Sequence, residues 1–170
     1  CSKYITGGIV VGDKIVISGM GAVTPIGIGV DNFWKSLVDG VRGVGPITRF
    51  DTTELPVKFA AEVKNFVPED YMPKKLTREM ALFMQYGYAA AEEALTDAGL
   101  NPENPEDRVV PAERIGIVVG TAYAGIAPIE ETQDGISTGQ HSKVSPRFVP
   151  KIIGNVAAAQ IAIAKGFRGP

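Results

Sequence analysis

A short apolar run that ends abruptly at glycine constrains the fold more than any other stretch of this sequence. Ile115–Val119 is rich in β-branched residues, and Gly120 follows it directly. Such a run is typical of a strand buried on both faces, as in a parallel sheet covered by helices. Ligands of open α/β sheets bind beyond the carboxyl ends of the strands, so we expect the turn after Gly120 to border a site. Tyr123, the one large side chain in this turn, either faces that site or packs in the core.

The rest of the chain alternates between strand-like and helix-like patterns, which favours an α/β fold. We predict a strand at Lys14–Ser18, a short strand within Val57–Val63, and loops at residues 22–27 and 41–51. We predict helices from Asp31 as N-cap to Gly40, over Leu76–Ala98 with Gly99 behind it, over Ile126–Ile136, and from Pro150 to Gly166. The last helix is apolar nearly all round, so we expect a partner subunit or a further part of the chain to cover it.

Composition excludes several classes of function. A length of 170 residues suits one domain, and a net charge of −2 provides no whole-chain basic field for nucleic acid. The apolar runs are shorter than a membrane span. Cys1 is the only cysteine and His141 the only histidine, so an internal disulfide and a cysteine-based metal site are excluded. We expect no metal and no cofactor. Residues 1–13 are interpreted as a terminal extension or a cloning remnant without function.

Two local patterns have competing interpretations. Gly19-Met20-Gly21 follows a predicted strand, but Thr24 stands where a dinucleotide loop needs its third glycine, so a tight turn is the better interpretation. Lys74, Lys75 and Arg78 cluster at the start of a predicted helix, where cations oppose the helix dipole. A solvated surface is one interpretation of this cluster, and binding of an acidic partner is the other.

Several stretches taken together resemble the β-ketoacyl-acyl-carrier-protein synthases of the KAS II type. The matching stretches are Ile17–Gly27, Arg49–Val63, Phe83–Leu100, Ile115–Gly125 and Lys143–Pro170. They occur in family order and cover nearly all of residues 14–170. The resemblance implies a thiolase-like α/β fold, in which residues 14–170 form the N-terminal half of a five-layered α-β-α-β-α structure and stop before the nucleophile strand.

The resemblance also implies an activity and its partners. Members are acyltransferases that perform a decarboxylative Claisen condensation of an acyl thioester with malonyl-acyl carrier protein in fatty-acid elongation. It implies a homodimer in the cytoplasm, or in an organellar matrix in a eukaryote, with acyl carrier protein and malonyl and acyl thioesters as partners and no nucleic acid or membrane. The family's nucleophilic cysteine is expected just beyond Pro170, and its two histidines further on. Cys1 and His141 match none of these, so we assign no catalytic residue and expect this chain alone to be inactive.

The resemblance places two sets of binding residues in this chain. The residues that match the lining of the family's acyl tunnel are Ala122, Tyr123, Ile126, Phe148 and Val149. Of these, Phe148 and Val149 match residues that reach into the partner's tunnel, and Tyr123 stands at a gate position that usually holds a smaller aliphatic residue. The residues that match the family's basic positions for docking the carrier protein are Lys75, Arg78 and Lys143. Two departures weaken the match: Glu79 stands where a basic residue is common, and Ala81 replaces a common aspartate.

Two alternatives to an active synthase stay open. One is a non-catalytic relative of the chain-length-factor type, which pairs with an active ketosynthase. The other is a carrier-protein-binding or structural fragment without chemistry of its own. The residue at the family's nucleophile position separates the first alternative from an enzyme, and carrier binding without acyl transfer would favour the second.

Overall fold

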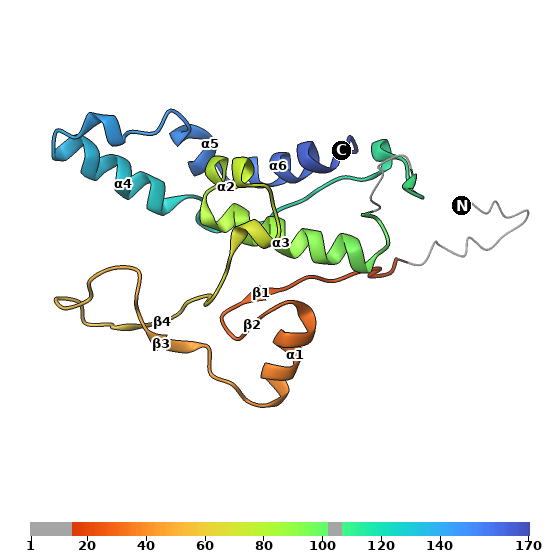
Figure 1. Cartoon of the computed structure of the whole chain (residues 1–170), viewed down its shortest axis with the longest axis horizontal. Coiled ribbons are helices and arrows are strands. Elements are labelled where there is room, and N and C mark those ends of the chain that lie inside the picture. The colour runs from red at the N-terminus through yellow and green to blue at the C-terminus, as the bar shows by residue number, and fades with distance from the viewer. Residues whose placement is uncertain (1–14, 102–106) are drawn as a thin grey trace, which may run out of the picture.

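Helix α3 (Leu82–Asp97) lies at the centre of the molecule (Figure 1). The computed structural model describes residues 15–101 and 107–170. Helix α6 (Val156–Lys165) packs along one side of α3, and the segment that leads into strand β1 (Val23–Thr24) packs along the other. The prediction for residues 1–13 lies outside the described residues.

Short hairpins form the strands of the described chain. Strand β1 pairs antiparallel with β2 (Gly27–Ile28), and β3 (Val44–Pro46) pairs antiparallel with β4 (Phe59–Ala61). The other helices are α1 (Val30–Val38), α2 (Lys74–Glu79), α4 (Ile126–Ser137) and α5 (Phe148–Ile152), with 3-10 helices η1 (Pro68–Asp70), η3 (Ala112–Arg114) and η4 (His141–Lys143).

The hairpins correct two loop predictions. β4 confirms the strand predicted within Val57–Val63, but β1, β2 and β3 lie in segments predicted as loops. The first hairpin turns at Pro25, and the Thr24 hydroxyl donates to the Gly27 carbonyl (2.8 Å). Proline pre-sets the backbone for such a turn, so the residue that suggested a loop is part of a hairpin.

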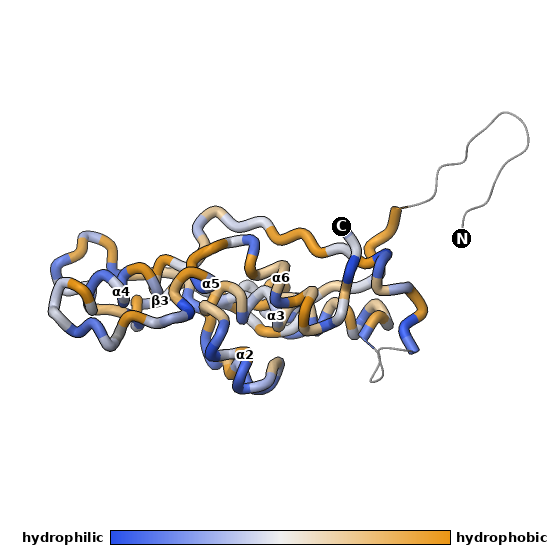
Figure 2. The backbone as a smooth tube through the Cα atoms, turned by 90° about the horizontal axis from the view of Figure 1, so that it is seen from above, coloured by the Kyte–Doolittle hydropathy of each residue, from blue (hydrophilic) through white to orange (hydrophobic). Residues whose placement is uncertain are grey.

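The two predicted buried strands are extended in the structure but are not paired as strands. Residues 15–18 are exposed, and residues 115–119 alternate between half-buried and exposed. Ile115 accepts one hydrogen bond, from the Gly169 N–H (3.0 Å). In Figure 2 the apolar residues 15–17 follow directly after the grey trace. Both strand predictions are therefore wrong for the described residues, because an apolar run becomes a strand only beside a neighbouring strand.

The helix predicted over Leu76–Ala98 is two helices, because Met80 and Ala81 are extended between α2 and α3. The Gln85 side chain donates to the carbonyls of Thr77 (3.0 Å) and Met80 (3.1 Å). It thereby supplies donors that the end of α2 lacks. The break buries both Met80 and Ala81 in the core.

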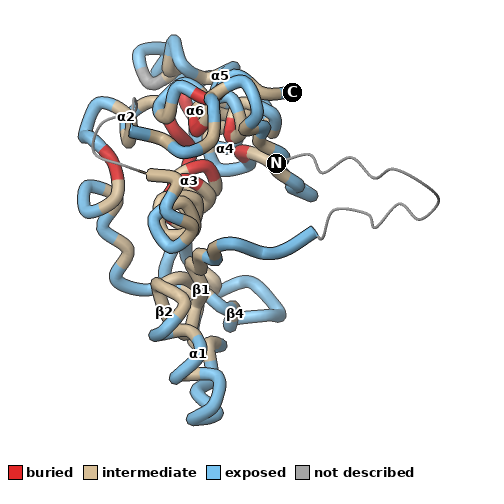
Figure 3. Tube along the Cα trace, turned by 90° about the vertical axis from the view of Figure 1, so that its right-hand side faces the viewer, coloured by how far each residue is buried: buried red, intermediate tan, exposed pale blue. Residues whose placement is uncertain are grey.

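The helix predicted from Pro150 also divides into two. α5 ends at Ile152, Ile153 is extended, and α6 begins at Val156. Gly99 and Gly166 follow α3 and α6 with positive φ, as predicted. The apolar core lies where α3, α6 and the segment around α2 meet (Figure 3), and its cluster of buried residues is Met72, Met80, Met84, Tyr88, Ala157 and Ile161.

Two carboxylates of α3 bind the backbone of the extended segment before β1. Glu93 accepts from the N–H of Ala22 (2.9 Å), and Asp97 accepts from the N–H of Met20 (3.0 Å). Residues four apart on a helix and two apart on an extended chain both advance about 6 Å, so the two spacings match. The carboxylates thus occupy the place that a neighbouring strand would take.

Glu93 also binds the start of α1, where Asp31 was predicted to be the N-cap. Its second carboxylate oxygen accepts from the Val30 N–H (2.7 Å), while the N-cap position belongs to Gly29 with φ 88°. Asp31 lies two residues after the N-cap, inside the first turn of the helix. The prediction for Asp31 is wrong because a side chain 63 positions away supplies the acceptor.

Candidate functional site

The two segments that match the acyl tunnel lie against each other in the structure. A Cβ added at Gly125 would overlap the Lys151 carbonyl of α5, and one at Gly154 would lie 2.9 Å from Cγ2 of Thr121. α4 and α5 are in contact as well. The turn at residues 121–125 therefore approaches the backbone around α5 as closely as glycine permits. This packing brings Ala122, Tyr123 and Ile126 to the same region as Phe148 and Val149.

Tyr123 lies on the surface of this chain. Its side chain is 78% exposed, and its carbonyl accepts from the Thr121 hydroxyl (3.0 Å), which closes the turn. Ala122, Ile126 and Val149 are exposed too, while Phe148 is half-buried. The interpretation of Tyr123 as a core residue is therefore wrong for the described chain, and its role as a gate stays a prediction.

Ile126 borders a hollow between the first turn of α4 and the first turn of α3. The α3 side of this hollow is formed by Leu82, Phe83 and Tyr86. Arg49 donates to the Tyr86 hydroxyl (2.7 Å) at its edge. An apolar group could bind here without leaving a buried polar atom unpaired. No sequence pattern indicated that α3 would lie at this site.

The predicted docking residues belong to two elements. Lys75 and Arg78 are both exposed on α2. Lys75 borders a groove between α2 and α6, together with Leu76, Glu79 and Ile163, so an acidic side chain lies beside the predicted basic patch. Lys143 belongs to η4, which packs on α4, but its side chain lies outside the described part of the structure.

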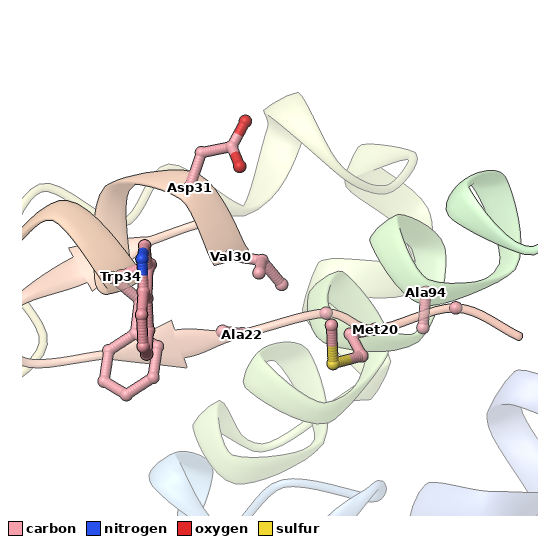
Figure 4. A pocket seen from close by; sticks show the side chains of 9 residues that line it. Met20, Ala22, Val30, Asp31, Trp34 and Ala94 are labelled. Atoms are coloured by element: carbon pink, nitrogen blue, oxygen red, sulfur yellow. The ribbon is translucent and has the colours of Figure 1, made fainter. Parts of the chain in front are cut away.

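A larger apolar groove lies between α1, α3 and the segment before β1 (Figure 4). Met20 and Trp34 border it and are more than half exposed, and Asp31 is the one charged residue among its lining. Gly19 and Gly21 form its floor in extended backbone, not in the tight turn that was predicted. A Cβ at Gly19 would lie 2.9 Å from the Ala98 Cβ, and one at Gly21 would lie 2.8 Å from the Ala90 carbonyl carbon. These glycines therefore permit contact with α3.

A half-buried polar cluster joins α3 to the end of α6. Glu92 forms an ion pair with Lys165 (2.5 Å), and Asn101 contacts both, donating to Glu92 and accepting from Lys165 (3.0 Å each). Burial and then the hydrogen bond with Glu92 raise the pKa of the Tyr88 phenol well above its ordinary value. Sequence patterns missed this cluster and Glu93, although adjacent acids on an alanine-rich helix were a usable signal.

The remaining candidates do not form a catalytic group. His141 is exposed in η4, and Cys1 lies outside the described residues. Within residues 15–101 and 107–170, no three acidic, histidine or cysteine side chains come together as metal ligands. In the same part of the chain, none of the helices combines the length and the apolar character that crossing a membrane requires.

Curated proteins and a family model match this sequence over most of its length. Residues 12–170 match the model for the β-ketoacyl synthase N-terminal domain. The 3-oxoacyl-[acyl-carrier-protein] synthase 2 of Vibrio cholerae is 42% identical over 159 residues, and its namesake in Staphylococcus aureus is 40% identical over 158 residues. In both comparisons the match covers 92% of this chain and 37% of the relative. The chain thus spans little more than a third of these relatives.

Solved structures share the fold. A β-ketoacyl synthase from Burkholderia phymatum superposes with a TM-score of 0.74 at 25% identity, covering 91% of this chain and 37% of that one. The ishigamide ketosynthase/chain length factor has a TM-score of 0.68 at 28% identity, covering 91% and 38%. These likenesses show the thiolase-like α/β fold, with this chain as its N-terminal half. The protein is a member of the β-ketoacyl synthase family, and residues 12–170 match the N-terminal domain of that family.

Proposed function

We propose that the complete protein, meaning this chain together with the remaining part that its relatives have, is a β-ketoacyl-acyl-carrier-protein synthase of fatty-acid elongation. The name and the 42% identity of the Vibrio cholerae relative support this proposal. The structural observation that carries it is the close approach of Gly125 to the Lys151 carbonyl. This approach places the two segments matched to an acyl tunnel side by side.

The proposed reaction forms a carbon–carbon bond between two thioesters. A cysteine thiolate first attacks the acyl-carrier thioester, so that the acyl group becomes bound to the cysteine as a new thioester and the carrier's thiolate leaves. Malonyl-carrier then loses carbon dioxide, its α-carbon attacks the acyl carbonyl, and the cysteine thiolate leaves. Two histidines stabilise the negative charge that develops on the thioester oxygens. Cys1 and His141 do not match these three positions, so we assign the reaction's catalytic groups to the remaining part of the protein.

The activity is tested by incubating the complete protein with acyl-carrier and malonyl-carrier and detecting the β-ketoacyl product by mass spectrometry. We expect product from the complete protein and none from the 170-residue chain. Absence of product from the complete protein would reject the proposal. Turnover by the 170-residue chain would reject the assignment of the catalytic groups.

The proposed carrier contact uses the exposed cations of α2. Lys75 and Arg78 would attract an acidic carrier protein, and Lys143 would extend the same patch. Changing Lys75 and Arg78 to Glu in the complete protein should weaken carrier binding and flatten its salt dependence. Lys35→Glu on α1 is the matched control, because α1 lies on the other side of α3 (Figure 1). Equal affinity of the double variant and this control at low salt would reject the patch.

The proposal also includes a cytoplasmic homodimer. α6 has an apolar face that this chain leaves open, since Ile163 is 76% exposed. Covering such a helix with a second subunit would remove this apolar surface from water. Sedimentation of the complete protein should give twice the mass of one chain, and a concentration-independent monomer would contradict the dimer.

A non-catalytic partner of the chain-length-factor type is the second candidate. The likeness to the ishigamide ketosynthase/chain length factor favours it, because that structure includes a chain length factor. A complete protein with no turnover alone, but with turnover restored by a separate active ketosynthase, would support this candidate.

A further inference from the structure

The last residue of α6 is held by side chains from two other segments. The Lys165 ammonium pairs with the Glu92 carboxylate of α3 (2.5 Å) and donates to the Asn101 side chain (3.0 Å), whose amide donates in turn to Glu92 (3.0 Å). The side chains of Lys165 and Glu92 are 15% and 18% exposed, so water and salt screen their attraction less than that of a surface pair. We call these three residues the Lys165 cluster.

Arg108 holds the main chain of the same residue. Its guanidinium donates to the Lys165 carbonyl (2.9 Å) and lies over the ring of Phe167, 4.7 Å from the ring centroid. Phe167 is buried, so Arg108 rests on a ring that is itself held by its surroundings. The last carbonyls of a helix have no partner within the helix, and Arg108 supplies a donor to one of them. The side chain and the main chain of Lys165 are therefore both anchored to segments distant in sequence.

Past α6, the chain crosses the extended segment that leads to the turn at residues 121–125. The Gly169 N–H donates to the Ile115 carbonyl (3.0 Å), and a Cβ added at Gly116 would overlap the Pro170 carbonyl. The two segments therefore approach each other as closely as glycine permits. Where they cross depends on where α6 ends, and hence on the contacts that anchor its last residue.

We propose that Lys165 and Arg108 are positioning residues for the condensation. This inference rests on the proposed synthase function. The matched family model is an N-terminal domain, so the remaining part, to which we assigned the catalytic groups, follows residue 170 in the complete protein. By fixing the crossing, Lys165 and Arg108 set the catalytic groups against the turn at residues 121–125, which belongs to the proposed acyl site.

The chemistry of the Lys165 cluster suits positioning better than stabilisation. Two charges lose hydration when they are shielded from water, and apolar replacement of such a pair is often neutral or even stabilising. Hydrogen bonds between charged groups require a defined distance and angle, whereas apolar side chains can slide past each other. An ion pair between the otherwise apolar α3 and α6 therefore fixes the register of one helix on the other.

The test replaces the ion pair by apolar side chains of similar length. Glu92→Met combined with Lys165→Met in the complete protein leaves neither charge unpaired, so the thermal midpoint should change little. The loosened crossing should lower kcat about tenfold, since a small misplacement of reacting groups slows catalysis strongly, while KM for acyl-carrier stays within about twofold. Arg108→Lys keeps the charge but loses the flat guanidinium over Phe167, and it should lower kcat in the same way.

Met84→Ala is the matched control, because Met84 lies in the core between α3 and α6 but outside the Lys165 cluster. It should lower the thermal midpoint and leave kcat unchanged when all variants are assayed well below their midpoints. If the double variant does not fold, Arg108→Lys decides alone.

Two results would overturn the positioning role and leave the synthase function standing. One is an unchanged kcat in the double variant and in Arg108→Lys, with the unmodified protein active. The other is an equal fall of kcat in Met84→Ala, because any loosening of the core would then have the same effect. No product from the unmodified protein would reject the synthase function, and this inference with it.

Discussion

The region around α3 and α6 and the region around α4 and α5 use apolar residues in opposite ways. α3 buries Met84, Tyr88 and Ala89, and α6 contributes Ala157 and Ile161 to the same cluster. α4 has Gly135 as its one buried residue and leaves its isoleucines open to solvent. In Figure 3 the buried residues gather near α3 and α6. The core that this chain builds by itself is therefore separate from the region that was matched to substrate binding.

The difference indicates what each region requires. The α3–α6 region is held by apolar packing and by the Glu92–Lys165 ion pair, both formed within this chain. The α4–α5 region contains the matched tunnel residues and exposes all of them except Phe148, which is half-buried. We expect its final geometry to depend on contacts with a partner subunit or with the remaining part of the protein.

The largest effect that separates the two regions should come from removing a buried side chain of α3. Met84 is 1% exposed, so Met84→Ala should lower the free energy of unfolding by about 2–5 kcal/mol, as large-to-small core changes do. Ile136→Ala on α4, at a half-exposed position, is the comparison and should change it by less than about 1 kcal/mol. Urea unfolding of both variants of this chain measures the difference. Equal losses would mean that the core is not confined to α3 and α6.

A smaller loss should follow removal of the Glu93 carboxylate. Glu93→Ala leaves the N–H groups of Ala22 and Val30 without their acceptor, which should cost about 1–3 kcal/mol. Asp97→Ala is the matched control, because it removes one acceptor at an exposed position and should cost less. Amide hydrogen exchange at Ala22 and Val30 should become faster in Glu93→Ala and stay unchanged in Asp97→Ala. Unaltered exchange there would contradict the role of Glu93.

Tyr123→Ala should hardly change stability. An exposed side chain away from special features contributes about 0.5 kcal/mol or less, so the unfolding midpoint of this chain should move little. In the complete protein the same change should extend the accepted acyl chain length, because the gate position then holds a small residue. A loss of about 3–5 kcal/mol would instead indicate core packing and would remove the argument for a gate.

The smallest effect concerns pH and the β3–β4 hairpin. The Thr48 hydroxyl donates to the Glu62 carboxylate (2.7 Å) and holds the pKa of Glu62 below its ordinary value. A carboxyl whose pKa is lowered on folding stabilises the protein above its unfolded pKa and loses that contribution as pH falls through the folded pKa.

Thr48→Val should therefore raise the Glu62 pKa toward its ordinary value, as followed by an NMR titration. Asp51 is the internal control, because its pKa is lowered by the separate Thr53 hydroxyl and should stay low. Parallel movement of both carboxyls would point to a general change in the fold.

The sequence by itself determined the family, the segments in which helices occur and the glycines that follow α3 and α6. Periodic apolar residues and terminal glycines such as Gly99 and Gly166 are local signals, because the hydrogen bonds and caps of a helix join residues that lie within about a turn of each other in the sequence. The stretch from Ile115 to Gly125 was likewise enough to propose a turn beside a ligand, and Tyr123 was a visible departure from its small neighbours.

Only the tertiary structure decided how distant segments complete each other. Asp31 had the sequence position of a cap for α1, yet Glu93 supplies the acceptor, since a capping carboxylate can come from any segment that folds close enough. Ile115–Val119 had the composition of a strand but remained unpaired, because pairing requires a neighbour that no local pattern provides. The hollow beside Ile126 was not visible in the sequence for the same reason: Phe83 and Ile126 are 43 positions apart in the chain and border the same hollow only because α3 and α4 begin close together in the fold.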